Sequence, residues 1–436
     1  MPSANQPFEW FAEARFGLFI HWGIYALIGR EAQVLFRERL NPGQYRKLAH
    51  RFNPRRFDAD DWARQARKAG MRYAVLTTKH CDGFCLFDSR LTDYTAARTG
   101  AGRDLVAEYV RAMRRHGLRV GLYFSLCDWS WPAYFRGAKK DPSGFAEFLQ
   151  FVHGQVRELC SNYGQIDVLW FDGGWPYDAA VWQSEKLDRL IRRLQPHVMI
   201  NDRLHGGGFG NVIPVGNASR RTHGYFNTFE QRAVDGNGAN RRPNEMAETS
   251  QDTSWGYHRG DRCWKTPRQI VKLLATAAAS DANLLLNVGP TTAGRFPSPF
   301  RRILRETGRW LKVNGEAFFG VTGVRGPDLS TVGSLGTGKR GRLYIHAFYW
   351  PGTQFHVHGL ANQVTGVRIL GSRHPVQFTQ RGLDLYLSNL PRCSPDPSCA
   401  VIRLDLKGYP KRHPSVIHLF ENRGDPATLV KWAERS

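Results

Sequence analysis

The chain has few acidic residues, few cysteines and no long hydrophobic run, and these shortages determine its net charge, argue against a disulfide framework and argue against a membrane span. Its 436 residues contain 38 Asp and Glu against 61 Lys and Arg, which gives a formal net charge of +23. Seven scattered cysteines are too few for a disulfide framework, so we expect reduced thiols. No apolar run is long enough to span a bilayer, and the N-terminal stretch does not resemble a secretory signal. We therefore predict a cytoplasmic protein without a membrane span.

Nucleic-acid motifs are missing too, although a charge of this size attracts polyanions. There is no zinc-finger spacing, RNP motif or long basic arm. The arginines instead follow helical stretches, where solvated helix faces account for most of them: R-A-M-R-R-H (111–116), L-I-R-R-L (190–194) and F-R-R-I-L-R (300–305). We predict no dedicated nucleic-acid binding and leave an anionic glycan open as a partner.

The signatures of metal and dinucleotide sites are also absent. His80, Cys81, Asp82 and Cys85 are close in sequence, but adjacent side chains on a strand point to opposite faces, and no C-x-x-C or H-E-x-x-H motif accompanies them. The glycine cluster at 206–210 does not follow a strand, as a dinucleotide fingerprint would. No thiol has an obvious base beside it for nucleophilic catalysis. We predict neither a metal nor a cofactor.

The sequence does contain a series of continuous apolar runs that alternate with helical patterns. Such runs are typical of parallel strands buried on both faces by crossover helices. The predicted strands are 15–23, 73–78, 119–125, 167–171, 197–201 and 283–288, and the predicted helices lie within 58–70, 103–117, 143–162, 178–195, 267–280 and 298–313. These repeated units predict an α/β fold, a TIM-like (β/α)8 barrel, with a doubly wound sheet as the alternative.

The pattern changes near Gly320. Segments such as R-L-Y-I-H-A-F-Y-W and V-I-R-L-D-L alternate between apolar and polar residues, and Gly/Pro turns separate them. Alternation of this kind predicts antiparallel strands with one buried face. We therefore predict two domains, a catalytic barrel over 1–320 and a small antiparallel β-sandwich over 321–436.

Polar and aromatic residues collect where the predicted strands end. In a (β/α)8 barrel the C-terminal strand ends form the mouth that carries the chemistry. Here they read I-H-W-G, K-H-C-D-G-F, S-L-C-D-W, W-F-D-G-G-W, I-N-D-R and N-V-G-P. Aromatic rings stack on the apolar patches of a sugar, and charged groups bind its hydroxyls. Each of these residues alone is more often structural, but six agreeing strand ends favour a carbohydrate ligand.

The same strand ends form longer motifs in a fixed order: R-F-G-L-F-I-H-W-G-I-Y, K-H-C-D-G-F-C-L-F-D-S, G-L-Y-F-S-L-C-D-W, V-L-W-F-D-G-G-W, I-N-D-R and N-L-L-L-N-V-G-P. From Phe8 to Gly320 the chain thus resembles the α-L-fucosidases of glycoside hydrolase family 29. The resemblance implies a retaining exo-glycosidase that releases terminal α-L-fucose through a covalent glycosyl-enzyme. It also implies that Asp172, at the end of the fourth strand of the family, is the nucleophile.

The resemblance further implies a glutamate as general acid/base. The family often reads W-E about ten residues before W-G-Y, and Glu245 stands ten residues before Trp255. Glu245 is therefore the best match, with Glu248 and Glu230 as alternatives. An acid of this kind needs surroundings that keep it protonated until it meets the glycosidic oxygen.

Other site residues are carried over position by position. His21, His80, Trp170 and Arg203 match sugar-binding positions of the family, and Phe124 stands where the family commonly has a tyrosine.

Three departures fall in the sugar-binding part. Cys81 replaces a histidine, Ala32-Gln33 appear in place of a Glu-Trp pair, and Asn244 replaces the tryptophan before the acid/base. Losing polar contacts shifts specificity, because the site no longer presents the partners that one substrate needs. Three hypotheses follow: an α-L-fucosidase or a glycosidase of related sugar specificity, a glycan-binding protein on a degenerate glycosidase scaffold, and a polyanion binder. The linkage, the aglycone and the oligomeric state stay open.

Overall fold

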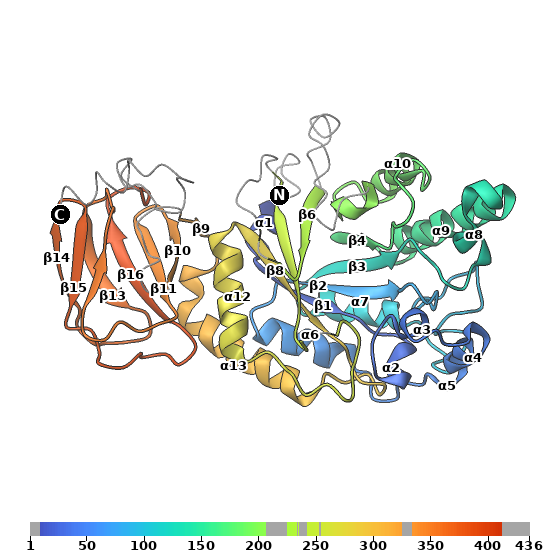
Figure 1. Ribbon diagram of the computed structural model, residues 1–436, viewed down its shortest axis with the longest axis horizontal. Coiled ribbons are helices and arrows are strands. Elements are labelled where there is room, and N and C mark those ends of the chain that lie inside the picture. Colours follow the sequence, from blue (N-terminus) through green and yellow to red (C-terminus); the bar gives the residue numbers. More distant parts are fainter. Residues whose placement is uncertain are drawn as a thin grey trace. The chain divides into compact units, whose positions relative to one another are not determined.

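A computed structural model of the chain describes residues 9–205, 225–232, 234, 242–252, 254–324 and 334–411. The chain divides into two units, Met1–Lys312 and Val313–Ser436, drawn in Figure 1. The glycine cluster at 206–210 lies outside the described residues. Across the described helices, none is long and apolar enough to cross a membrane.

Eight parallel strands close into a barrel in the first unit (Figure 1). Each strand pairs with the next along the chain, and the last pairs with the first. The strands are β1 (Phe16–Ile20), β2 (Tyr73–Lys79), β3 (Arg119–Ser125), β4 (Val168–Asp172), β5 (Met199–Asn201), β6 (Tyr225–Glu230), β7 (Asn244–Thr249) and β8 (Ala282–Val288). The closed order confirms the predicted TIM-like barrel and excludes the doubly wound sheet.

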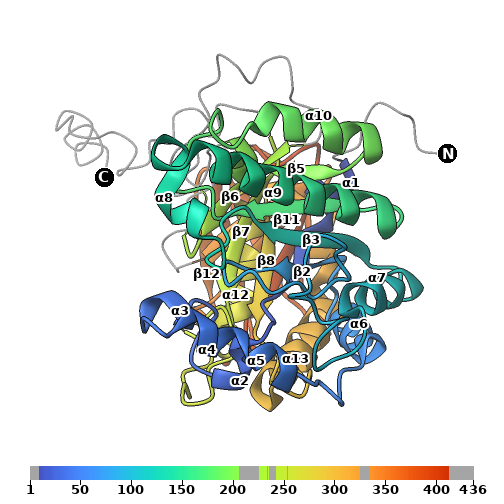
Figure 2. The same ribbon diagram turned by 90° about the vertical axis from the view of Figure 1, so that its right-hand side faces the viewer.

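Helices follow most strands, and in Figure 2 two of them, α9 and α10, lie side by side on the outside of the barrel. The main helices are α6 (Ala59–Lys68), α7 (Leu105–Arg115), α9 (Pro142–Asn162), α10 (Ser184–Leu194), α12 (Pro267–Ala279) and α13 (Ser298–Asn314). Shorter ones are α1 (Glu9–Ala14), α2 (Tyr25–Ile28), α3 (Val34–Arg37), α4 (Pro42–Arg46), α5 (Leu48–Arg51), α8 (Pro132–Lys140), η1 (Asp202–His205) and η2 (Gly315–Ala317).

The ends of α6 follow from its sequence. The Asp58 carboxylate accepts a hydrogen bond of 3.0 Å from the Asp61 N–H, as an N-cap does. After Lys68 the chain turns at Gly70, which has a φ of +89°, a left-handed value that favours glycine. Helix α6 therefore lies within the predicted range 58–70, between a capping aspartate and a glycine.

The sequence predicted six of the eight barrel strands and missed β6 and β7. Both segments, Y-F-N-T-F-E and N-E-M-A-E-T, interleave polar residues with apolar ones and form no continuous apolar run. Most of their polar side chains are nevertheless buried; Glu245 is completely buried and Thr228 is 4 % exposed. The hydrophobic pattern fails here because the barrel interior itself contains hydrogen-bonded polar groups.

Alternation along β4 decides which side chains enter the barrel. Val168 and Trp170 belong to the apolar cluster inside it, with Tyr123, Phe19 and Phe226 from neighbouring strands. Asp172 is in register with these inward residues, two positions beyond Trp170, and ends the strand. A carboxylate is thereby set on top of a packed aromatic floor.

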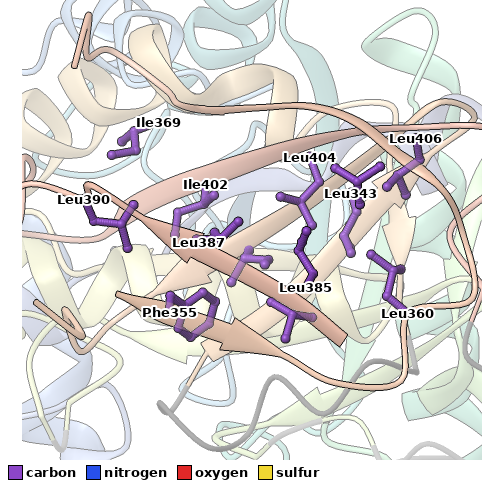
Figure 3. Close-up of a cluster of buried hydrophobic side chains, with 13 residues drawn as sticks. Leu343, Phe355, Leu360, Ile369, Leu385, Leu387, Leu390, Ile402, Leu404 and Leu406 are labelled. Atoms are coloured by element: carbon purple, nitrogen blue, oxygen red, sulfur yellow. The ribbon is translucent and has the colours of Figure 1, made fainter. Parts of the chain in front are cut away.

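The second unit contains two antiparallel sheets. Their orders are β13-β16-β11-β10-β9 and β12-β15-β14. The strands are β9 (Thr322–Gly323), β10 (Ser334–Lys339), β11 (Arg342–Ala347), β12 (Phe355–Val357), β13 (Val364–Ile369), β14 (Gln377–Arg381), β15 (Asp384–Ser388) and β16 (Ala400–Leu406). Figure 3 shows leucines and isoleucines of both sheets meeting in one apolar core. The predicted antiparallel β-sandwich is confirmed.

Candidate active site

A pocket of about 240 Å³ opens at the C-terminal ends of the barrel strands. Carboxylates, guanidinium groups, imidazoles and indoles all contribute to its wall, a mixture suited to a ligand with many hydroxyl groups. The lining residues are Phe19, His21, Glu31, Ala32, Gln33, Arg37, His80, Tyr123, Trp170, Asp172, Trp175, Arg203, Glu230 and Trp255. Of the predicted site residues, this pocket brings together Asp172, His21, His80, Trp170 and Arg203.

Asp172 is held from two sides. The Tyr123 hydroxyl donates to its Oδ2 at 2.9 Å, and Nη1 of Arg203 donates to its Oδ1 at 2.7 Å. The next residue, Gly173, has a φ of +68°, and a Cβ there would lie 2.6 Å from Ser125 Oγ and 2.7 Å from Cys127 Sγ. The glycine after the strand is therefore required for the turn that leaves Asp172 at the pocket floor.

Arg203 joins Asp172 to Glu230. Its Nη2 donates to Glu230 Oε2 at 2.7 Å, so one planar fork holds two carboxylates at its two ends. Burial by itself lowers the pKa of Arg203, but the two carboxylates outweigh it and raise the pKa above its ordinary value. The guanidinium thus stays charged, and it also lies over the Trp170 ring, 4.6 Å from its centre.

The two histidines of the pocket are neutral near pH 7. Burial lowers the pKa of His80 to about 4, and burial with the nearby His80 lowers that of His21 well below its usual range. His21 Nδ1 lies 2.7 Å from Asn287 Oδ1, an acceptor, so it donates and leaves Nε2 as an acceptor. His80 Nδ1 is buried and has no partner among the described residues. Both rings therefore offer neutral hydrogen-bonding atoms.

Glu31 contributes a carboxylate that the sequence did not predict. It accepts hydrogen bonds from the backbone N–H groups of Ala32 at 2.6 Å and Trp255 at 3.1 Å. Burial raises its pKa, against the effect of those donors. The expected loss of a Glu-Trp pair at Ala32-Gln33 is thus only partly correct, because an acidic side chain still lines this wall and Ala32 occupies the place beside it.

Glu245 does not lie at the pocket. It is the second residue of β7, pairs with Thr228 and Asn283, and is completely buried inside the barrel. Trp170 Nε1 donates to its Oε1 at 2.8 Å, and the Tyr73 hydroxyl donates to Oε2. Trp170 lines the pocket, so the indole separates this carboxyl from any bound substrate. This position argues against the predicted acid/base role, which needs contact with the glycosidic oxygen, while the pKa of Glu245, raised by burial to about 7, is of the kind that such an acid needs.

The two alternatives differ in position. Glu230 is the last residue of β6 and lines the pocket, whereas Glu248 points away from it toward Lys265, at 3.8 Å. The C-terminal strand-end rule therefore favours Glu230, which the sequence offered only as an alternative because β6 was not recognised as a strand.

Two predicted sugar contacts also point elsewhere. Cys81 is buried with its Sγ 3.3 Å from Ser125 Oγ, and a hydrogen bond with Cys127, together with burial, raises the pKa of its thiol. Phe124 packs outside the barrel against Phe171, with ring centres 6.5 Å apart. Neither lines the pocket. The tyrosine that does so is Tyr123, one residue earlier, as strand alternation requires.

Comparisons with known proteins agree on one family. Residues 2–316 match the family model described as Alpha-L-fucosidase. The tissue alpha-L-fucosidase of Mus musculus is 30% identical over 89% of this chain and 88% of its own length. The plasma alpha-L-fucosidase of Homo sapiens is 32% identical over 89% of this chain and 87% of its own.

Solved structures extend the similarity to the fold. Alpha-L-fucosidase isoenzyme 1 from Paenibacillus thiaminolyticus superimposes with a TM-score of 0.82 at 36% identity, covering 92% of this chain and 99% of that one. A GH29 alpha-L-fucosidase from Bacteroides thetaiotaomicron, a trapped covalent intermediate in complex with 2-fluoro-fucosyl fluoride, has a TM-score of 0.80 at 27% identity, covering 92% and 96%. That intermediate was obtained with a glutamate-to-glutamine mutant.

Proposed function

This chain belongs to the α-L-fucosidase family, and on that premise we propose that Asp172 and Glu230 hydrolyse a terminal α-L-fucoside by double displacement. The observation that carries the proposal is the Arg203 fork, which sets two carboxyl groups side by side in one pocket. Retaining glycosidases hold such a pair about 5–5.5 Å apart. Two carboxylates at opposite ends of one guanidinium are compatible with that spacing.

In the first step, Asp172 attacks the anomeric carbon while the protonated form of Glu230, with its proton on the oxygen that does not accept from Arg203, gives that proton to the glycosidic oxygen. The carbon–oxygen bond breaks, the aglycone leaves as an alcohol, and the sugar becomes an ester of Asp172. In the second step, Glu230 takes a proton from water, the resulting nucleophile attacks the same carbon, and the Asp172 carboxylate is released. The Glu230 side chain is 30% exposed, so water reaches it between the steps.

The rest of the pocket orients the sugar and the nucleophile. Tyr123 and Arg203 fix the two oxygens of Asp172, which limits the carboxylate to one direction of attack. His21 and His80 present neutral nitrogen atoms to the hydroxyl groups of the sugar. Trp170 and Trp255 supply flat apolar surfaces for its carbon face.

Retained fucose specificity is supported by where the three sequence departures lie. Cys81 and Asn244 do not line the pocket, whereas Ala32 does. Glu31 keeps a carboxylate in the same wall, so the lost feature is one aromatic side chain. We therefore propose that the enzyme is specific for α-L-fucose and not for a different sugar. The space beside Ala32 is wider than it would be with the tryptophan of the family's Glu-Trp pair, and it admits substituents which that side chain would exclude.

The test uses an aryl α-L-fucoside and three variants. Asp172→Gly abolishes turnover, and added azide restores it with formation of the inverted glycosyl azide. Glu230→Ala is rescued by azide with retention, because azide then attacks the glycosyl-enzyme from the side of the missing acid/base. Glu245→Gln keeps most of its turnover. If Glu245→Gln is inactive while Glu230→Ala is unaffected, the assignment of the acid/base is wrong; fucose bound but never hydrolysed would favour a glycan-binding protein.

The proposal extends to the charge of the substrate, which we expect to be anionic. Arg37 ends α3 at the pocket and is exposed, and its Nε donates to Gln33 Oε1 at 3.0 Å. Its position and the net charge of +23 support binding of a sulfated or carboxylated aglycone.

The predicted cytoplasmic location is also kept as a proposal. It is supported by Cys263 and Cys393, two exposed cysteines that are free in the described part of the chain. Cell fractionation of the full chain, with detection by antibody, tests it; recovery from the culture medium would reject it.

A further inference from the structure

The outer face of the sheet β12-β15-β14 carries one histidine on β12 and a second directly after that strand. Strands β12 and β15 are antiparallel, with Phe355 opposite Leu387 and His356 opposite Tyr386. Phe355, Leu385 and Leu387 point into the apolar core (Figure 3). By the alternation of a strand, His356 and Tyr386 therefore face outward. His358 and Asp384 continue the same alternation, so the outward face gathers two imidazoles and a carboxylate from two strands.

These three side chains converge on a single point. His356 Nε2 lies 2.8 Å from Asp384 Oδ1, and His358 Nδ1 lies 2.7 Å from the same oxygen. The ligand atoms of all three residues fall within 4.8 Å of one another. Ligand atoms around a tetrahedral Zn²⁺ with bonds of about 2.0–2.1 Å are roughly 3.3 Å apart. The two N–O separations in the cluster are shorter than this, so the side chains would have to move apart slightly to hold the ion.

The orientation of the cluster is fixed by packing. The His356 ring stacks on Tyr386, with centres 4.6 Å apart and planes 6° from parallel. His356 and His358 are each about half exposed, at 47% and 49%. At such exposure a hydrogen bond or ion pair contributes little to folding, since water competes for the same groups. Holding two imidazoles against one carboxylate is therefore better explained by a ligand that bonds to all three.

We propose that His356, His358 and Asp384 bind a borderline divalent cation, Zn²⁺ in the first instance. Imidazole nitrogen with one carboxylate suits Zn²⁺ and its neighbours in the transition series, whereas Ca²⁺ and Mg²⁺ prefer oxygen ligands alone. Three protein ligands leave a coordination position open to water or to a further ligand. The cation would join β12 to β15 across the sheet. The proposal is independent of the function assigned to the barrel pocket.

The first test is calorimetric titration of Zn²⁺ into the metal-stripped full chain at pH 7.5. Wild type binds, while His358→Ala and Asp384→Ala each lower the affinity at least tenfold. Two control variants keep wild-type affinity: His197→Ala removes another exposed histidine, and Cys393→Ser removes an exposed thiol of the same unit. Unchanged affinity in His358→Ala and Asp384→Ala, or a loss in the controls instead, overturns the proposal.

A second measurement identifies the ligands. Co²⁺ in place of Zn²⁺ gives visible absorption bands in wild type, which disappear in His356→Gln and weaken as the pH falls, because protons compete for the imidazole nitrogens. Zn²⁺ also raises the thermal midpoint of wild type but not of His358→Ala. Turnover of an aryl fucoside by each variant shows that it is folded. Absence of Co²⁺ bands in the wild type would mean a hydrogen-bonded cluster that holds no metal, and would reject the site.

Discussion

Asp172 and Glu230 come from different strands but share one guanidinium, each at 2.7 Å from a different terminal nitrogen of Arg203. The fork compensates two negative charges that would otherwise repel each other in a poorly hydrated pocket. It also sets their relative direction, because the guanidinium is planar and rigid. The geometry of the proposed catalytic pair therefore depends on an arginine that itself takes no part in proton transfer.

Arg203→Lys is expected to lower kcat at least 100-fold with a smaller effect on KM. A lysine keeps the positive charge but is a point donor and cannot hold both carboxylates in one plane. Steady-state kinetics on an aryl α-L-fucoside measure the change. Arg119→Lys is the matched control, since Arg119 pairs with Asp167 at 2.9 Å near the other end of the barrel strands. An equal loss of activity in both variants would point to folding rather than to the fork.

Tyr123→Phe removes the hydroxyl that donates to Asp172 Oδ2. A hydrogen bond to a charged group contributes about 1.5–3 kcal/mol, so we expect kcat to fall roughly 10- to 100-fold. Tyr109→Phe serves as the control, because its buried hydroxyl donates to the Gly121 carbonyl at 3.1 Å and does not reach the pocket. A Tyr123→Phe enzyme with wild-type kcat would show that Arg203 alone orients the nucleophile.

Glu245→Gln is expected to change the pH dependence of stability rather than turnover. Burial raises the pKa of Glu245 from 4.5 to about 7. The protonated carboxyl is thus favoured in the folded state; its contribution is full below pH 4.5 and is lost as the pH rises through 7. The loss is on the order of 3 kcal/mol. The glutamine variant has no such titration, so its stability relative to wild type should increase with pH.

Urea unfolding of both proteins at pH 4.5, 6 and 8 measures this difference. Asp82, whose pKa burial also raises to about 7, titrates in both proteins and cancels in the comparison. A constant difference across the three pH values would mean that Glu245 ionises normally inside the barrel.

Arg37→Gln tests whether the rim of the pocket binds negatively charged groups on the aglycone. KM for an aryl α-L-fucoside bearing a sulfate on the aryl group should rise several-fold, while KM for the neutral aryl fucoside stays the same. Added salt should reduce the difference, as screening of an exposed charge requires. Arg64→Gln on α6 makes the same change in net charge away from the pocket. An equal rise in KM for both variants would assign the effect to the overall field of the protein.

The sequence predicted the barrel, six of its strand ends and the position of Asp172 at one of them, because continuous apolar strands place the residue that follows them. It failed where that signal is absent. Strand β6 is interrupted by polar residues, so Glu230 was not recognised as a strand end, and spacing to Trp255 favoured Glu245 instead. Glu230 lines the pocket, whereas Glu245 is buried inside the barrel and accepts from the Trp170 indole N–H, and linear spacing does not encode that difference.

A similar reason explains Phe124 and Cys81. Both stand within one residue of a side chain that lines the pocket, Tyr123 and His80, and both face the other way. Applying alternation from Asp172 backward across the register of β3 and β4 would have selected Tyr123. Glu31 had no such signal, because it lies outside any strand. Its carboxylate is oriented by the backbone N–H groups of Ala32 and of the distant Trp255.

The pocket does not share the excess of positive charge that the rest of the molecule carries. Its neutral histidines leave three carboxylates, from Glu31, Asp172 and Glu230, to face the two guanidinium groups of Arg37 and Arg203. A chain of net charge +23 therefore encloses a cavity with no excess of positive charge. The positively charged exterior would attract a polyanionic glycan, whereas the carboxylates at the pocket floor would repel its charged groups. We expect such an enzyme to trim uncharged terminal residues from an acidic polymer and to stop at the first one that carries a sulfate.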